Sequence, residues 1–338
     1  MNSQEAENRL VDVIRLKHFA LATESSYRGW LRRYIGFLKI DRNEGTHEQK
    51  MERFLTILAK DGVAASTQNQ AFNAIRFFYV EVLKVPLQNV DALRANRPAH
   101  VRTAPDRATT EKFLSLVRDA HGYPARLVVF LLYGMGLRLN EPLNLRIKDV
   151  NIEDSLITIR GAKGGKDRVR SIPCCLMPAI QNQIRRAQFI FEQATEQGVP
   201  TKLPGGIGRK YPAAEHSFGW FWLFPSKTPC KDARDNNRLV WWHMHEANVQ
   251  RSCKLAAAQI GMNGVISPHV LRHAWATHAL QAGANVKAIQ SAMGHVCLDT
   301  TAGYLHESTQ VSSPLDALVA ARMSVLPEHQ PIICLLKP

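Results

Sequence analysis

The stretch PARLVVFLLYGMGLRLNEPLNLR, residues 124–146, places a continuous apolar segment directly before a charged one. The apolar residues have helical spacing, which predicts a helix over 124–133. Arg138 stands after this helix and before the next helical segment, and Glu141 follows three residues later, within reach on one helical face. The sequence therefore predicts that Glu141 holds the Arg138 guanidinium in a fixed pose.

Residues on the C-terminal side predict one β-hairpin and further helices. The segment SLITIRGAKGGKDRVRSIP, residues 155–173, alternates as two short strands around a turn rich in Lys and Gly, which is typical of a hairpin. Helical spacing resumes over 177–197, and helices dominate from Trp241 onward. Between them, residues 198–238 are rich in Gly, Pro and aromatic side chains.

On the N-terminal side, residues 3–85 predict four helices with no strand-like alternation between them. The third helix is marked by a capping box, with Thr46 as N-cap and Gln49 three residues later, and the fourth is expected from about residue 66 to residue 83. Residues 86–105 contain three prolines and a basic bias, which favours an interdomain linker over an ordinary solvated loop. A helix over 109–120 follows.

The composition limits the class of protein. The chain has 338 residues, with 43 Lys and Arg against 29 Asp and Glu, a formal net charge of +14. Its length predicts two domains, and its charge fits nucleic acid as the partner. No apolar run approaches the ~18 residues of a membrane span, and the start has no secretory signal, so we expect a cytoplasmic protein without membrane contact. The six cysteines lack CxxC spacing, which argues against a disulfide framework or a thiolate zinc site.

The segment SPHVLRHAWATH, residues 267–278, contains a second arginine of interest. Ser267 followed by Pro268 marks a helix start. His269 and Arg272 are three residues apart, so an imidazole and a guanidinium are expected to project from the first turn of one helix.

A third segment, MGHVCLDTTAGYLH at residues 293–306, places His295 nine residues before Tyr304. Arginines pair with phosphate oxygens, a histidine can take a proton from a nucleophile, and tyrosine can be a covalent nucleophile. With a hairpin lysine, the set predicts phosphoryl transfer without a metal. His243 and His245 do not change this, because residues two apart do not share a helical face.

Each of these residues alone is more often structural, but their order and spacing are similar to those of the tyrosine recombinase (phage integrase) family. The residues that match are Arg138, Lys163, His269, Arg272, His295 and Tyr304. The resemblance covers nearly the whole chain. A narrower resemblance, to the integron integrases, rests on RKYPAAEHSFGWFWLFP at 209–225, TESSYRGWLRRYIGF at 23–37 and SPLDAL at 313–318.

The resemblance implies a mainly helical chain with a small β-sheet, in which a helical core-binding domain precedes an α+β catalytic domain. The expected parts are a SAM-like DNA-binding domain at 1–88, a basic linker at 89–105, a catalytic domain at 106–325 with an insertion at about 190–240, and a tail at 326–338.

The resemblance also implies a reaction. Tyr304 attacks the scissile phosphate, forms a 3′-phosphotyrosyl link and releases a 5′-hydroxyl. His269 is the base toward Tyr304, and Lys163 on the hairpin turn protonates the leaving oxygen, with Lys166 as the competing candidate.

In the same scheme, Arg138 and Arg272 hold the non-bridging oxygens, Glu141 orients Arg138, and His295 donates a hydrogen bond to the phosphate. No metal or nucleotide cofactor is expected, because the covalent intermediate conserves the energy of the phosphoester bond.

The integron-type resemblance implies exchange of gene cassettes between duplex attI and folded single-stranded attC sites. It implies a homotetramer on bacterial DNA, with residues 312–323 as the exchanged C-terminal helix. The insertion aromatics either form a small core or stack on unpaired bases. Pro212, His216 and Trp220 are the candidate base contacts.

Three alternatives stay open: another tyrosine recombinase acting on duplex sites, either a phage integrase or a dimer-resolving enzyme; a type IB topoisomerase, which needs no partner protomer; and a non-catalytic DNA-binding protein. The last has no use for a tyrosine placed nine residues after a histidine. The chain departs from the integron integrase pattern at residues 238–245, and at Ala274 and Trp275, where Ser and Phe are common. None of these departures removes a catalytic group.

Overall fold

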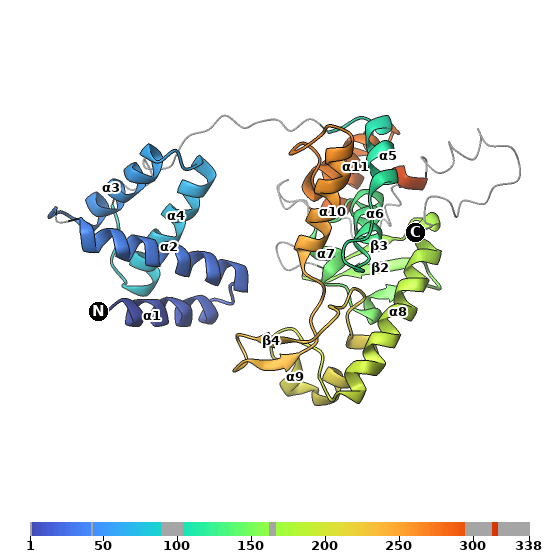
Figure 1. The fold of residues 1–338 in the computed structure, drawn as a ribbon, viewed down its shortest axis with the longest axis horizontal. Helices are drawn as coiled ribbons and strands as arrows, with labels where there is room; N and C mark the ends of the chain where they lie inside the picture. The colour runs from blue at the N-terminus through green and yellow to red at the C-terminus, as the bar shows by residue number, and fades with distance from the viewer. Residues whose placement is uncertain (1, 42, 89–103, 162–166, 295–312, 317–338) are drawn as a thin grey trace, which may run out of the picture. The chain divides into compact units, whose positions relative to one another are not determined.

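Figure 1 shows a computed structural model of the chain, which describes all residues except 1, 42, 89–103, 162–166, 295–312 and 317–338. The chain divides into two compact units, residues 1–101 and 102–338. None of the helices among the described residues is long and apolar enough to cross a membrane.

The N-terminal unit contains the four expected helices. They are α1 (Ser3–Leu16), α2 (Leu21–Ile40), α3 (His47–Lys60) and α4 (Ala65–Phe77), and α4 continues as a π-helical turn over Phe78–Val82. The predicted capping box of α3 is present, because the Thr46 side chain accepts from the Gln49 backbone N–H and the Gln49 side chain accepts from that of Thr46. In the core, the hydroxyls of Tyr34 and Tyr79 lie 2.9 Å apart, which satisfies both buried groups.

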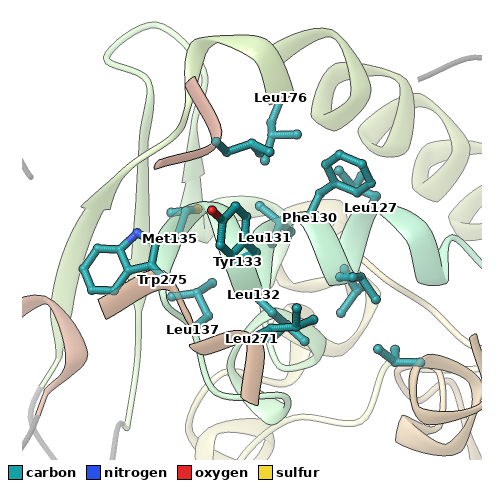
Figure 2. Packing of buried hydrophobic residues seen from close by; sticks show 14 of the residues in the cluster. Leu127, Phe130, Leu131, Leu132, Tyr133, Met135, Leu137, Leu176, Leu271 and Trp275 are labelled. Atoms are coloured by element: carbon teal, nitrogen blue, oxygen red, sulfur yellow. The ribbon is translucent and has the colours of Figure 1, made fainter. Parts of the chain in front are cut away.

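The second unit is built around one buried helix, α6 (Ala125–Met135). Every α6 residue except Arg126 is buried, which fits its almost wholly apolar sequence. It packs against α10 (Glu246–Gln259) and α11 (Pro268–Gln281), and Figure 2 shows Leu271 and Trp275 of α11 beside the α6 side chains. This packing fixes the chain that leaves α6 toward Arg138.

The helix expected over 109–120 is shorter than predicted: α5 spans Arg107–Leu116, with Asp106 as its N-cap. The chain must turn before α6. His121 and Gly122 both have positive φ, 52° and 70°, and Ala120 bridges to Tyr123. This tight turn is incompatible with continuing α5.

The predicted hairpin consists of β2 (Leu156–Ile159) and β3 (Arg168–Ser171), and a short strand that the sequence did not predict, β1 (Val150–Asn151), pairs with β2. All pairs are antiparallel, in the order β1-β2-β3. Ile157 pairs with Arg170 and Ile159 with Arg168, so both arginines lie on the face of the buried isoleucines.

The remaining elements complete the second unit. They are α7 (Asn140–Leu143), α8 (Met177–Glu196), α9 (Ile207–Lys210), β4 (Cys230–Asp232), β5 (Arg238–Val240) and α12 (Val286–Met293). The insertion is defined here as residues 198–245, between α8 and α10. Its own small core joins Phe221 and Trp241 to Ala187 and Ala194 of α8.

The left-handed turn at Gly136 yields a test of this packing. Gly136 ends α6 with φ 65°, and a Cβ there would overlap the Trp275 ring. We expect Gly136→Ala to lower the free energy of unfolding by about 3 kcal/mol, since strained backbone and overpacking add. Gly198→Ala is the control, with φ 63° and no described atom near the added Cβ, and it should cost only about 1 kcal/mol. Urea unfolding followed by tryptophan fluorescence measures both, and equal losses would contradict the packing argument.

Candidate active site

Arg138 and Glu141 make the predicted contact. The Arg138 backbone N–H donates to Glu141 Oε2 at 2.7 Å, and its Nη1 donates to Oε1 at 3.0 Å. Arg138 Nη2 also donates to the Gly294 carbonyl at 3.2 Å. The Arg138 side chain is 24% exposed.

Arg272 is the fifth residue of α11, just beyond the first turn that the sequence predicted, and its side chain is only 3% exposed. Its Nη1 donates to the Gly136 carbonyl at 2.6 Å, and its Nη2 donates to the Met293 carbonyl. Its Nη1 also lies 3.8 Å from Glu141 Oε2. Burial, reinforced by the nearby Arg138 charge, lowers the pKa of Arg272 to about 10.

Two further arginines of the site were not predicted from sequence, and both come from β3. Arg168 Nη2 donates to Glu141 Oε2 at 2.6 Å. Arg170 Nη2 donates to the Met135 carbonyl at 3.1 Å, and its guanidinium lies 5.1 Å from the centre of the Trp275 ring. Their i, i+2 spacing in a strand was the available signal, because it places both side chains on one face.

Glu141 is the acid that these guanidiniums share. Ion pairs join its carboxylate to Arg138, Arg168 and, at 3.8 Å, Arg272. Burial alone would raise the pKa of Glu141, but the hydrogen bonds from Arg168 and Arg138 outweigh it, and the pKa is lowered. The cluster therefore keeps an excess of buried positive charge, which suits a bound anion such as a phosphate.

His269 is exposed at the start of α11, where Ser267 is the N-cap as predicted. Its ring lies 5.4 Å from the ring of His273, one helical turn later. His273 is a second exposed imidazole that sequence reasoning did not single out. The i, i+4 spacing of the two histidines was its signal.

Three predicted residues lie outside the described residues: Lys163, with its competitor Lys166, then His295 and Tyr304. The described chain that follows the first gap and the described chain that precedes the second gap both contact the arginine cluster. Arg168 begins β3 directly after the hairpin turn, and its Nε donates to the Ala292 carbonyl in the last turn of α12 at 3.1 Å.

The insertion holds the candidate base contacts. Pro212 and His216 are exposed, whereas Trp220 is half-buried. The Lys148 ammonium lies 2.8 Å from the centre of the Trp220 ring, and the Trp220 carbonyl accepts from Arg146 at 2.8 Å. Trp220 is thus held on one ring face and at its backbone.

The two histidines weighed as metal ligands have local contacts. The His243 ring packs edge-on against Trp222, and the His245 side chain caps α10 by accepting from the Ala247 N–H at 3.1 Å. Burial lowers the pKa of His243, so its neutral form is favoured. Within the described part of the chain, no three His, Cys, Asp or Glu side chains are grouped to hold a metal ion.

Clustered, partly buried arginines suit a protein that binds phosphate groups. Comparison with known families is specific. Residues 106–310 match the phage integrase family, and residues 8–89 match the phage integrase N-terminal SAM-like domain. The chain belongs to the phage integrase family, and it is a tyrosine recombinase, an enzyme that breaks and rejoins DNA.

Relatives and solved structures agree with this assignment. The chain is 35% identical over 328 residues to an integrase/recombinase of Escherichia coli, covering 94% of this chain and 95% of the relative. It is 28% identical over 321 residues to the tyrosine recombinase XerA of Pyrococcus furiosus, covering 90% of this chain and 96% of XerA. The fold resembles that of XerH bound to a palindromic difH substrate, with TM-score 0.58 and 16% identity over 97% of this chain and 85% of XerH. The fold also resembles that of the Tn1549 transposon integrase bound to DNA, with TM-score 0.55 and 16% identity over 95% of this chain and 99% of that structure. The predicted fold class is confirmed.

The shared carboxylate predicts a pH-dependent stability. Glu141→Gln should lower the free energy of unfolding by roughly 3 kcal/mol at neutral pH, because buried guanidiniums lose their counter-charge. The pKa of Glu141 is lowered from 4.5 in the folded state, so its contribution is complete above pH 4.5 and is lost as pH falls through the folded value. Urea unfolding across this range should show the difference between wild type and variant shrinking in acid. A difference that is independent of pH would contradict the assigned ion pairs.

Proposed function

We propose that this tyrosine recombinase is an integron integrase that acts on bacterial DNA in the cytoplasm. It inserts and excises gene cassettes by joining duplex attI sites to folded single-stranded attC sites. The observation that carries this proposal is the insertion at residues 198–245, a folded subdomain with its own aromatic core and exposed Pro212 and His216. Such a subdomain adds a surface for extrahelical bases beside a general phosphate-binding site.

The anchoring of the insertion supports this role. Arg146, five residues after Glu141, donates from Nη1 to the Trp220 carbonyl and from Nη2 to the Lys202 carbonyl, both at 2.8 Å. Its guanidinium carbon lies 3.3 Å from the centre of the Trp222 ring. A base bound by the insertion would therefore be held in fixed register with the chain that carries the catalytic arginines.

In the proposed reaction, the Tyr304 oxygen attacks the scissile phosphorus and the bond to the 5′-oxygen breaks. His269 accepts the tyrosine proton and Lys163 gives a proton to the leaving oxygen, so protons balance across the step. The released 5′-hydroxyl of one strand then attacks the phosphotyrosine of a partner strand. The phosphoester bond is exchanged rather than hydrolysed, which accounts for a reaction without a nucleotide cofactor.

The arginines stabilise the negative charge that develops on the phosphate in the transition state. In the proposal, Arg138, whose side chain is 24% exposed, and Arg272 donate to the phosphate, and His295 adds a hydrogen bond. Glu141 keeps both arginines oriented before DNA binds, which lowers the reorganisation needed in the transition state.

Exchange of C-terminal helices in a DNA-bound homotetramer is part of the proposal. Of the expected helix, only residues 313–316 are described, and they pack on their own chain. Leu315 is buried in the core around α6, and the Ser313 hydroxyl donates to the Gly134 carbonyl at 2.7 Å. Exchange would have to extend beyond this docked start.

A recombinase of the dimer-resolving type acting on duplex sites is the second candidate. The similarity to the tyrosine recombinase XerA of Pyrococcus furiosus, over 90% of this chain and 96% of that protein, supports a tyrosine recombinase without specifying integron sites, and so keeps this candidate. The insertion distinguishes the two, because a duplex site offers no unpaired base for stacking.

The nucleophile is tested by Tyr304→Phe, which removes only a hydroxyl. We expect no covalent protein–DNA adduct and nearly unchanged DNA affinity, measured with a nicked oligonucleotide that traps the phosphotyrosine. Tyr211→Phe is the control, since Tyr211 is exposed on the insertion, and it should form adducts normally. Adducts with the Tyr304 variant would disprove the assignment.

The subfamily is tested by His216→Ala. This variant should bind a folded single-stranded site with extrahelical bases roughly tenfold less tightly, the equivalent of a lost base contact, while its affinity for a duplex site barely changes. Lys231→Ala, another exposed insertion residue, should weaken binding to both DNAs alike, because it removes only phosphate attraction. Gel-shift titrations measure both, with thermal unfolding as the check on folding. Equal losses for His216→Ala would favour the second candidate.

A further inference from the structure

Arg168 is a largely buried charged side chain of the site that has no role in the proposed reaction. Its side chain is 12% exposed. One terminal nitrogen donates to Glu141 Oε2 at 2.6 Å, the same oxygen that accepts from the Arg138 backbone, and its Nε donates to the Ala292 carbonyl at 3.1 Å. Arg168 thus connects β3, α7 and the end of α12.

We propose that Arg168 is a positioning residue for strand cleavage, which acts through Glu141 on Arg138 and fixes the end of α12 that leads to residue 295. This inference rests on the proposed function, because it assumes that Arg138 binds the scissile phosphate. The guanidinium group of Arg168 is planar and rigid. Its bonds to the Glu141 carboxylate and to the Ala292 carbonyl therefore fix the distance between Glu141 and Ala292.

The contacts of Arg168 do not favour a purely stabilising role for this residue. Its Nη1 is buried and has no hydrogen-bond partner among the described residues. Arg138, Arg170 and Arg272 add like charge nearby, and a buried ion pair is often no better for stability than an apolar side chain. Gly294, with φ 60°, lets the chain pass close, since a Cβ there would be 3.2 Å from Arg168 Nη1. These features fit a residue that keeps Glu141 and the end of α12 in position.

Single-turnover cleavage of a nicked oligonucleotide carrying an integron-type site tests the inference. Arg168→Gln should slow cleavage roughly 100-fold, as small misplacements of catalytic groups do, while the DNA Kd stays close to the wild-type value. Arg168→Lys keeps the charge next to Glu141 but loses the fork, and it should recover part of the rate. Arg160→Gln, in the same hairpin, removes a half-exposed arginine and should leave the rate within about twofold.

A double-mutant cycle separates positioning from general loss of stability. If Arg168 acts through Glu141, the variant with both Arg168→Gln and Glu141→Gln should cleave no more slowly than the slower single variant. Multiplied losses, an unchanged Arg168→Gln rate, or a rate loss matched by an equal loss of DNA affinity would each overturn the inference. Urea unfolding ensures that rates are compared among folded proteins.

The two proposals fail in different ways. A wild-type protein that forms no adduct on either a duplex or a folded single-stranded oligonucleotide contradicts the proposed function, and with it the role of Arg168. Normal wild-type cleavage together with an unaffected Arg168→Gln contradicts the role of Arg168 alone.

Discussion

The catalytic unit depends on one buried carboxylate that several guanidiniums share. Arg138, Arg168 and Arg272 come from three separate elements, and without Glu141 their like charges would repel each other across a medium of low dielectric constant. Glu141 joins the turn after α6, the first residue of β3 and the fifth residue of α11. The three guanidinium groups are thereby held close together.

Local signals predicted much of this architecture. The capping box at Thr46, the helix start at Ser267 and the i, i+3 pair Arg138 and Glu141 all depend on neighbours in the sequence, and all are present in the structure. The β-hairpin was also evident, because alternation and a glycine-rich turn are local properties. The helices around it, including α8, were found for the same reason.

What the sequence could not provide were contacts between distant segments. Arg168 reaches Glu141, 27 residues away, and Ala292, 124 residues away, so no spacing rule connects them. The early end of α5 likewise depends on the turn needed to enter the buried α6. The sequence left open whether the insertion aromatics form a core or stack on bases, and the structure divides them: Phe221 is buried while Tyr211 is exposed.

The separate hydrophobic cores have a consequence for stability. The arginine cluster is attached to the large core around α6, while the insertion packs on its own small core against α8 and the N-terminal unit has cores of its own. A substitution inside one of these cores therefore acts first on the packing of its own module. The stability of each module can change by small steps while the packing of the others is kept.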